Sequence, residues 1–331
     1  MFRRKLFKAT AALLTAVAVS VGFSGSSAMA AGLTSELTGL PVDASLVNQR
    51  PVAVMVDNES LALDHYNTAN ADIVYEMVNS TANNRITRLM CLYKDWKNIP
   101  QTGNIRSVRP TNILLAQEYN AVIVHDGGPY YVDGYLARYN QHLSANFSRV
   151  PNGKARVYTE FVFGNELVNR MAAAGFSSTY TVPTGDHFNF GVSNIASAGV
   201  VNTANNISLP FPHNASKLAY NAASKTYNYY EYGRLHQDVG TRAPLSFTNV
   251  IIQNVPMHQL DANGYMIYNV IGSGNGWYIT NGMATPINWV KSSESGVTTY
   301  TTADGQPLVV NPGKTYVGLV PSDSWASLSI Q

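Results

Sequence analysis

Residues 51–58 read PVAVMVDN, an unbroken apolar run that ends in an aspartate and an asparagine. Such a run predicts a β-strand covered on both faces, because a half-exposed strand would alternate apolar and polar residues. Further elements follow along the chain, with strands predicted at 72–78, 85–93 and 121–125 and helices at 111–119 and 159–174. Strands that take turns with helices predict an N-terminal α/β domain, in which helices flank a mixed sheet.

The second half of the chain has a different pattern. From about residue 189 the helical spacing disappears, and Asn281-Gly282 and Asp304-Gly305 are typical hairpin turns, since these residue types tolerate positive φ. Short strands are predicted at 219–232, 248–253, 264–270, 276–280, 308–311 and 316–320. These features predict a mostly antiparallel, β-rich C-terminal domain, so the fold class of the whole chain is α+β.

The first 30 residues have the features of a Sec-type signal peptide. A basic start at 3–8 precedes an apolar run at 9–23, and Ala28-Met29-Ala30 fits a small-residue cleavage site. The run at 9–23 is too short for a good transmembrane span, and no later stretch is long and apolar enough. We therefore expect cleavage near Ala30 and a secreted, extracytoplasmic protein without a transmembrane segment.

The mature chain is long enough for two domains. We expect an N-terminal domain at 31–185 and a β-rich domain at 186–331, with the boundary between 181 and 215, where prolines interrupt the pattern. Removing the four basic residues of the signal peptide from the 22 Lys and Arg leaves 18 against 20 Asp and Glu, a net charge of −2. No basic stripe remains, so nucleic acid is not an expected partner.

Cys91 is the only cysteine in the sequence. An intrachain disulfide is therefore excluded, and no cysteine near the expected cleavage site is present to carry a lipid anchor. Cys91 falls inside a predicted buried strand and no histidine motif accompanies it, so we interpret it as a core thiol rather than a nucleophile.

Residues 103–110, GNIRSVRP, place Arg106 and Arg109 three positions apart with Ser107 between them. Arginine stays charged at physiological pH, and its planar fork of donors fits carboxylate or phosphate groups. The segment lies between two apolar runs and therefore predicts an anion-binding site beside the sheet.

Other polar groups are predicted at the carboxyl ends of strands, where open α/β sheets bind ligands. They are Asp57, Asn58, Glu76, His125, Asp126, Gly127 and Gly128, with Arg88 in the third strand. In one interpretation the arginines and the backbone of 127–128 surround an anion, and Asp57, Glu76 or Asp126 acts as acid, base or metal ligand. In the other, Arg106 and Arg109 pair with Asp57 or Glu76 and fix a loop. We interpret Arg88 as structural, because it lies within a predicted strand, where such a side chain usually faces solvent or a carboxylate.

No strong catalytic or metal-binding motif is present. His125 is interpreted either as a general base or as a hydrogen-bonded core histidine. The seven histidines show no i, i+4 pair, and a Walker loop and a Gly-x-Ser-x-Gly elbow are missing, so no metal site and no cofactor are predicted. A divalent ion held by carboxylates stays an open alternative, because such sites need no tight spacing.

Tyrosines are frequent in the second half of the chain. Tyr227, Tyr229, Tyr230 and Tyr232 follow one another closely in a predicted strand. Exposed rings at these positions would stack on sugars, whereas rings on paired strands would contact one another across a hairpin. Both interpretations are left open by the sequence.

The order of several motifs resembles the DUF3048 family, the YerB-like exported proteins and lipoproteins of bacteria. In the first half these motifs are 51–58, 71–76, 86–88, 103–110 and 124–128, and in the second half 276–278, 281–282, Trp289 and 311–316. The resemblance implies an exported protein with an N-terminal α/β and a C-terminal β-rich domain, and it implies no established biochemical role.

The chain departs from the family pattern in three places. The lipobox cysteine is missing, so lipid anchoring is not carried over, and Asn104 stands where the family often has proline. The family's Asn-x-Tyr-Thr pattern is Arg156-Val157-Tyr158-Thr159 here. Tyr158 and Thr159 are retained as residues of the site wall.

The sequence supports three functional hypotheses. In the first, an envelope protein binds an anionic ligand, such as a cell-wall glycan or polymer with phosphate or carboxylate groups, at Arg106 and Arg109. In the second, a phosphoryl or glycosyl transferase or hydrolase uses the same arginines with Asp57, Glu76 or Asp126. In the third, the β-rich domain is a scaffold for protein partners. The sequence leaves open whether the protein is an enzyme and what its oligomeric state is.

Overall fold

Strand β1 (Val52–Asp57) lies inside the main sheet, and all six of its residues are buried. It pairs antiparallel with β3 (Thr87–Tyr93) and parallel with β5 (Val122–His125). On its other side, β3 pairs antiparallel with β2 (Ile73–Val78). The apolar run at 51–58 therefore forms the doubly covered strand that it predicts, and the N-terminal half has the predicted mixed sheet.

The computed structural model describes residues 32–331, apart from 183, 185–186, 194 and 196–201. The predicted signal peptide and its cleavage site lie outside the described residues, and so does part of the predicted domain boundary at 181–215. Leu33–Gln331 form one compact unit. Within the described part of the chain, no helix has both the length and the apolar character needed to cross a membrane.

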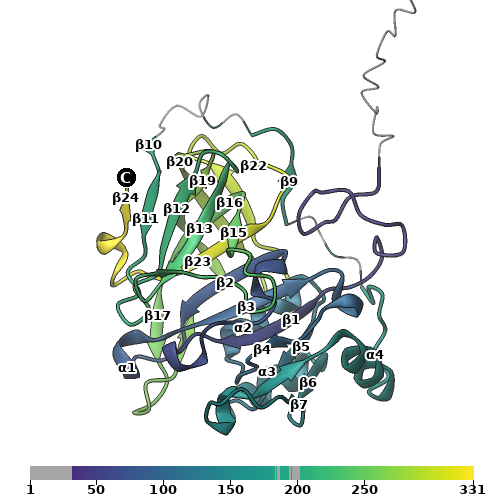
Figure 1. Ribbon diagram of the computed structural model, residues 1–331. Helices are drawn as coiled ribbons and strands as arrows, with labels where there is room; N and C mark the ends of the chain where they lie inside the picture. The colour runs from purple at the N-terminus through teal and green to yellow at the C-terminus, as the bar shows by residue number, and fades with distance from the viewer. Residues whose placement is uncertain (1–31, 183, 185–186, 194, 196–201) are drawn as a thin grey trace, which may run out of the picture. The chain divides into compact units, whose positions relative to one another are not determined.

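The main sheet contains strands from both halves of the chain (Figure 1). In spatial order its strands are β10 (Asn202–Thr203), β20 (Met283–Lys291), β19 (Gly272–Thr280), β16 (Asn249–Val255), β23 (Thr315–Pro321), β2, β3, β1, β5 and β6 (His142–Ser144), and β21 (Thr299–Thr302) pairs with β20. Strand β23 lies between β2 and β16 and is parallel to both. The backbone of one late strand thus joins the N-terminal strands to the C-terminal ones. The division at 181–215 into two domains stays a prediction.

A second sheet is built only from the C-terminal half and is antiparallel throughout its described pairs. Its strands are β14 (Arg234–Leu235), β13 (Thr226–Glu231), β12 (Lys217–Asn221), β11 (Asn206–Ser208) and β24 (Ser329–Ile330), and β15 (Ser246–Phe247) pairs with β13. This sheet packs on the main sheet, since the ring of Tyr316 on β23 lies 6.0 Å from that of Tyr229 and 5.5 Å from that of Phe247.

Two sequence predictions in this part of the chain need correction. The single strand predicted at 219–232 is a hairpin, because β12 and β13 pair antiparallel across a turn in which Lys225 has a φ of 55°. The helix predicted at 159–174 begins only at Gly164, the first residue of α4 (Gly164–Ala173). Glu160–Val162 form strand β8, whose backbone pairs with two other short strands.

The predicted helix at 111–119 is α2 (Pro110–Glu118), with Arg109 as its N-cap residue. It covers the face of the main sheet opposite the second sheet: the hydroxyl of Tyr119, which follows α2, lies 2.8 Å from that of Tyr75 on β2. The other helices are α1 (Ala82–Arg85), α3 (Asp133–Arg138) and the 3₁₀ turns η1 (Ser60–Ala62), η2 (Thr68–Asn70), η3 (Trp96–Asn98), η4 (Tyr130–Val132), η5 (Arg156–Tyr158) and η7 (Trp325–Ser327).

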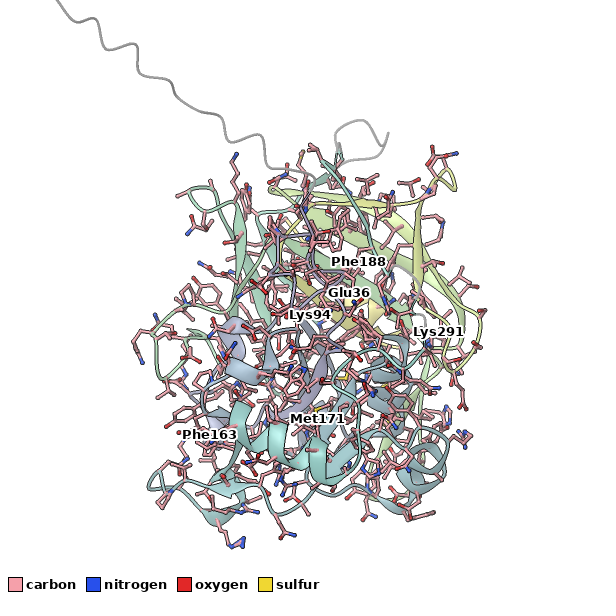
Figure 2. The ribbon with its side chains drawn as sticks, turned by 90° about the vertical axis from the view of Figure 1, so that its right-hand side faces the viewer. Glu36, Lys94, Phe163, Met171, Phe188 and Lys291 are labelled. Carbon is pink, nitrogen blue, oxygen red and sulfur yellow. The ribbon has the colours of Figure 1, made fainter. Side chains whose placement is uncertain are left out.

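Short strands complete the structure at the edges of the two sheets. They are β4 (Thr102–Gly103) with β8 and β7 (Ser148–Arg149), β17 (Met257–Gln259) with β18 (Met266–Tyr268), and β22 (Val309–Val310) with β9 (Asn189–Phe190). The segment before β1 is held by an ion pair of 2.8 Å between Glu36 and Lys94, which lie beside each other in Figure 2.

Candidate functional site

An ionic cluster lies at the carboxyl end of β1. The carboxylate of Asp57 forms an ion pair of 2.9 Å with the Nε atom of Arg106 and a longer one, 3.8 Å, with Arg88. Only 2% of the Asp57 side chain and 6% of the Arg88 side chain is exposed, whereas Arg106 keeps 31% of its side chain exposed. The predicted loop-fixing pair between Arg106 and Asp57 is therefore present, and Arg106 still reaches solvent.

The strand register explains why these residues meet. Asp57 on β1 stands directly opposite Arg88 on β3, because the two strands are antiparallel. The arginine segment then runs beside the end of β1: Ile105 forms a bridge with Val56, and the backbone N–H of Arg106 donates to the carbonyl of Met55 at 2.9 Å. Residues far apart in the sequence are thus brought to one strand end by backbone pairing.

Arg109 lies in the same region but has a different environment. It is 8% exposed, its Nη1 donates to the carbonyl of Val108 at 3.0 Å, and its guanidinium lies 4.7 Å from the ring centre of Tyr265. Among the described residues, no carboxylate forms an ion pair with Arg109. The alternative in which both Arg106 and Arg109 pair with Asp57 or Glu76 therefore holds for Arg106 alone.

Positive charge exceeds negative charge in this cluster. The guanidinium groups of Arg88 and Arg106 pair with the carboxylate of Asp57, and Arg109 acts on Arg88 as a third positive charge that has no ion pair among the described residues. Burial and then repulsion by Arg109 lower the pKa of Arg88 to about 9, although Asp57 opposes the change. Burial also lowers the pKa of Arg109 to about 10. An anion near the three groups would reduce this repulsion.

The turn at 126–128 pairs with the arginine segment. The N–H of Asp126 donates to the carbonyl of Arg106 at 3.1 Å, and the N–H of Val108 donates to the carbonyl of Gly127 at 3.1 Å. Gly127 has a φ of 70°, and Gly128 leaves no room for a Cβ beside Val132. The predicted turn is therefore present next to Arg106, with 36% of the Asp126 side chain exposed.

Three other predicted residues of this region have internal partners. The hydroxyl of Ser107 donates to the carbonyl of Asp126 at 2.9 Å, and that of Thr159 donates to the carbonyl of Arg156 at 2.8 Å. Burial raises the pKa of Tyr158, and the charges of Asp57 and Arg106 also act on it, so its ring belongs to the same neighbourhood. Ser107 and Tyr158 are partly exposed, whereas Thr159 is buried.

His125 is a hydrogen-bonded core residue. Its Nδ1 lies 2.8 Å from the carbonyl oxygen of Gly127, and its Nε2 lies 3.1 Å from the Nδ1 of His142. Burial lowers the pKa of His125 to about 4. Both ring nitrogens have hydrogen-bond partners, and the ring is neutral at pH 7. This agrees with the interpretation of His125 as a hydrogen-bonded core histidine.

Glu76 and Asn58 lie on the other face of the sheet. On β2, Met77 stands opposite Arg88, so its neighbour Glu76 points away from the arginines. The carboxylate of Glu76 accepts hydrogen bonds from the hydroxyls of Thr87, Ser216 and Tyr316, at 2.7, 2.6 and 2.6 Å. Glu76 is fully buried. It therefore joins the two sheets and takes no part in the arginine cluster.

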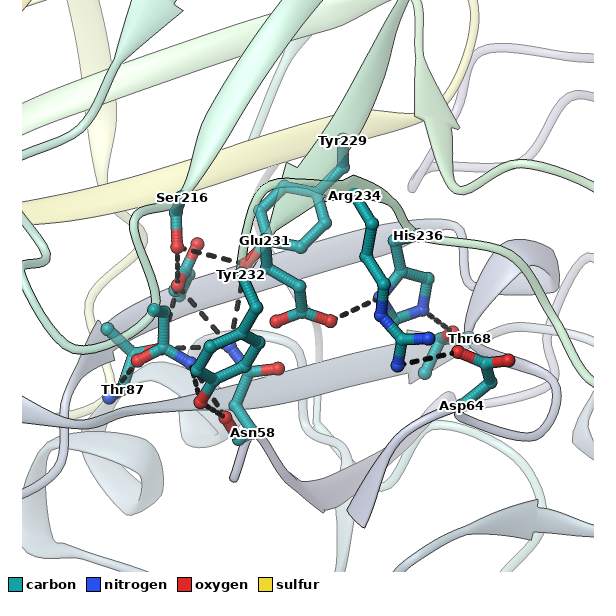
Figure 3. A network of polar contacts seen from close by, with 12 residues as sticks. Asn58, Asp64, Thr68, Thr87, Ser216, Tyr229, Glu231, Tyr232, Arg234 and His236 are labelled. Carbon is teal, nitrogen blue, oxygen red and sulfur yellow. Dashed lines mark hydrogen bonds and ion pairs between the residues drawn. The ribbon is translucent and has the colours of Figure 1, made fainter. Parts of the chain in front are cut away.

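Asn58 extends this buried network, part of which is drawn in Figure 3. Its side chain donates to Thr87 at 2.9 Å, and its carbonyl accepts from the side chain of Asn214 and from the hydroxyl of Tyr232, both at 2.6 Å. These contacts tie the end of β1 to the second sheet. The sequence signal for this separation is the alternation of side chains, which puts Asp57 and Asn58 on opposite faces.

Two family models match the chain. They are "Protein of unknown function (DUF3048) N-terminal domain", over residues 37–177, and "Protein of unknown function (DUF3048) C-terminal domain", over residues 207–317. The chain belongs to the DUF3048 family. The resemblance inferred from the order of motifs is thereby confirmed.

Similar proteins extend this DUF3048 assignment to nearly the full chain. The "Putative lipoprotein YerB" of Bacillus subtilis strain 168 is 24% identical over 322 residues, which cover 90% of this chain and 89% of that protein. The crystal structure of the YerB protein from Bacillus subtilis has a TM-score of 0.78 at 20% identity, and the match covers 90% of this chain and 99% of that one. The likeness supports the α+β fold.

The description as a lipoprotein applies to YerB, and we do not extend it to this DUF3048 chain. The only cysteine of this chain, Cys91, is fully buried in β3, where burial raises the pKa of the thiol to about 12. The interpretation of Cys91 as a core thiol agrees with this burial. That the protein has no lipid anchor stays a prediction.

The tyrosine cluster of this DUF3048 chain is largely a packing feature. Tyr227 and Tyr229 are fully buried on β13, so they are not available to stack on a sugar. The ring of Tyr227 lies 5.1 Å from that of Tyr220 on the paired strand β12. The cross-strand interpretation therefore holds for Tyr227, while Tyr229 packs against Tyr316 of the main sheet. Of the four tyrosines, Tyr230 and Tyr232 keep partly exposed side chains.

Glu76 makes the stability of the protein depend on pH. Burial raises its pKa to about 7, although Ser216, Tyr316 and Thr87 donate hydrogen bonds that favour the carboxylate. Between pH 4.5 and 7 the folded protein keeps a proton that Glu76 releases in the unfolded chain. Stability therefore falls as the pH rises through this window, by up to about 3 kcal/mol for this group.

We expect Glu76→Gln to remove that contribution. Burial lowers the pKa of His65 and of His236 to about 4, so these two groups make stability rise with pH. The pH profile of wild-type stability therefore combines their effect with the opposite effect of Glu76. Urea unfolding of both proteins at about pH 5 and pH 8 isolates the Glu76 part. The change in stability from the lower to the higher pH should be more positive in the variant, and parallel profiles would contradict this assignment.

Proposed function

We propose that this DUF3048 protein is exported and binds an anionic ligand of the cell envelope, with phosphate or carboxylate groups, through Arg88, Arg106 and Arg109. The observation that carries the proposal is the charge imbalance at the end of β1, where Arg88 and Arg106 pair with Asp57 and a third guanidinium group, of Arg109, acts on Arg88 without an ion pair among the described residues. Arginine forks bind phosphate and carboxylate oxygens with paired, charge-assisted hydrogen bonds. The signal-peptide pattern at 1–30 and the similarity to a protein described as a lipoprotein support an envelope location.

Arg106 is the residue that a ligand would meet first. About a third of its side chain, 31%, is exposed, whereas Arg88 and Arg109 are nearly covered. The two buried arginines would attract an anion mainly through their electrostatic field and not by direct contact, because solvent screens their charge only weakly. The turn at 127–128 lies next to the backbone of the arginine segment and consists of two glycines, which carry no side chains of their own.

The same geometry favours binding over group transfer. A transferase at this place would need a carboxylate free to act as base or metal ligand. Asp57 is paired with two arginines, and Glu76 lies on the other face of the sheet. Asp126 is partly exposed, but Arg149 pairs with it at 3.7 Å and also pairs with the neighbouring carboxylate of Glu160. We therefore rank the transferase or hydrolase hypothesis second.

The first test is anion binding to the mature chain from Ala31 onward, with inorganic phosphate and pyrophosphate as probes. A ligand that binds only the folded state raises the melting temperature, and the rise grows with the logarithm of the ligand concentration once this exceeds Kd. We expect pyrophosphate to raise it, and Arg106→Gln to weaken binding about 10-fold to 100-fold, the loss of one charge-assisted interaction of about 1.5–3 kcal/mol. Calorimetric titration checks the affinity.

Arg138→Gln serves as the matched control, because Arg138 lies on α3 and its side chain is 51% exposed. The control should bind pyrophosphate as the wild type does. Equal binding by Arg106→Gln and wild type would contradict the proposal, as would the absence of any rise in melting temperature with either anion. Arg106 is the preferred position because Arg109 is buried and its loss would also affect folding.

A further inference from the structure

Three ligand-type side chains meet in the buried layer between the two sheets. His65 lies between η1 and η2, Glu231 is the last residue of β13, and His236 follows β14. One candidate ligand atom of each residue lies within 4.8 Å of those of the other two. The three residues are 0%, 1% and 4% exposed, respectively. Figure 3 shows Glu231 and His236 pointing toward each other from the second sheet.

The cluster has buried polar atoms that lack partners. Both ring nitrogens of His65 and the Oε2 atom of Glu231 lack a hydrogen bond of good geometry, although the backbone of Asp57 lies beside His65 and the side chains of Asn58 and Tyr229 lie beside Glu231. A buried polar atom without a well-aligned partner costs about 1–3 kcal/mol, so native proteins rarely contain several in one place. A metal cation accepts lone pairs from both an imidazole and a carboxylate, so it would supply the partner that these atoms lack.

The rest of the cluster is arranged as metal sites commonly are. His236 places its Nδ1 at 2.6 Å from the Oε1 atom of Glu231 and its Nε2 at 2.9 Å from the hydroxyl of Thr68. Contacts of this kind fix the orientation of an imidazole. The charges of Asp64 and Asp238 act on His236 and favour a cation, and the opposing Arg234 is itself paired with Asp64 at 3.0 Å.

We propose that His65, Glu231 and His236 form a buried site for one divalent transition-metal ion, with Zn²⁺ as the best match. Two imidazoles and one carboxylate are a common donor set for Zn²⁺. The ion replaces one of the two hydrogen bonds of His236 and supplies the partner that His65 and Glu231 lack. Three protein ligands leave the fourth tetrahedral position for a water molecule. The ion stabilises the fold because the three ligands come together only in the folded chain.

The three proposed ligands come from the two halves of the chain. His65 belongs to the N-terminal family match, at 37–177, while Glu231 and His236 belong to the C-terminal match, at 207–317. An ion bound by all three therefore cross-links the loop after β1 to the hairpin of the second sheet. This inference does not rest on anion binding, because it uses none of the three arginines, although His65 lies beside the backbone of Asp57.

The test uses the whole mature chain and the metal alone. Protein unfolded in guanidinium chloride with a chelator is refolded with or without one equivalent of ZnCl₂ and then desalted. We expect about one zinc per chain by atomic emission, and a higher melting temperature than in the metal-free sample. Refolding with Co²⁺ should give the visible absorption of a nitrogen- and oxygen-ligated ion.

His65→Gln and Glu231→Gln should each bind zinc at least about tenfold more weakly and lose the zinc-dependent rise in melting temperature. His258→Gln is the matched control, because His258 is exposed on β17 and should retain both. Each variant is compared with itself with and without zinc, so a change in its own stability does not enter the result. A wild-type protein that refolds with no bound metal, or a His65→Gln protein that binds as much as wild type, would overturn the proposal.

Discussion

Glu118→Gln is expected to lower the free energy of unfolding by about 3–5 kcal/mol, the usual cost of leaving one member of a buried ion pair alone. The ammonium group of Lys291 lies 3.0 Å from the Oε1 atom of Glu118, and both side chains are 0% exposed. His187 contacts the second carboxylate oxygen at 3.4 Å, and the backbone of Thr298 donates to it at 2.9 Å. The variant would bury the charge of Lys291 without its partner.

This pair also holds the two halves of the chain together. Glu118 is the last residue of α2, which begins beside Arg109, and Lys291 is the last residue of β20. Burial opposes the ionisation of Glu118, but His187 and Lys291 more than offset it and hold the pKa of the carboxyl below its usual value. The loss should therefore appear in global urea unfolding and not only in local opening of the loop at 291–298.

Two further variants make the result specific. Glu118→Gln combined with Lys291→Met should recover part of the lost stability, because the double change removes both charges. Glu166→Gln is the matched control: Glu166 pairs with Arg170 at 3.2 Å on the surface of α4, and its loss should cost less than about 1 kcal/mol. Equal effects of Glu118→Gln and Glu166→Gln would show that the buried pair is not stabilising.

Glu76→Ala is the second substitution with a large expected effect, a loss of about 3–5 kcal/mol. The change takes the acceptor away from three buried hydroxyls, of Thr87, Ser216 and Tyr316. Each donor left without a partner costs about 1–3 kcal/mol, and the removed side chain leaves a cavity. Ser216 regains part of the loss, because its hydroxyl already lies 3.1 Å from that of Tyr229.

Urea unfolding at constant pH measures this effect, with Glu76→Gln as the matched variant. Glutamine keeps the volume and one acceptor oxygen, so it should cost less than half as much as alanine. If the alanine variant unfolds within about 1 kcal/mol of the wild type, the hydroxyls have found other partners and the carboxylate does not connect the two sheets as described.

The sequence predicted most, but not all, of the residues that meet in the arginine cluster. The segment 103–110 and the ends of the predicted strands indicated one region, and Asp57, Arg106 and the turn at 126–128 do meet there. Glu76 was grouped with them because it also lies near a strand end. The register of β2 against β3 turns it to the other face, and only the strand pairing decides that register.

The proximity of His65 and His236 is not indicated by their spacing in the sequence. The absence of an i, i+4 pair argued against a metal site, yet His65 and His236 come within 4.9 Å of each other, ring centre to ring centre. They come from a loop after β1 and from the segment after β14. No spacing rule connects two such segments, because their distance depends on how the second sheet packs on the first.

Local patterns along the chain specify the doubly buried strand at 51–58, the hairpin turn at Asn281-Gly282, the helix that begins at Pro110 and the family. Apolar periodicity and the φ preferences of turn residues act over a few positions, so they can be read along the chain. No local pattern specifies that β23 joins the two halves in one sheet or which polar side chains share a face. Strand pairing and sheet packing act between residues far apart in sequence, and the burial of the whole core selects them.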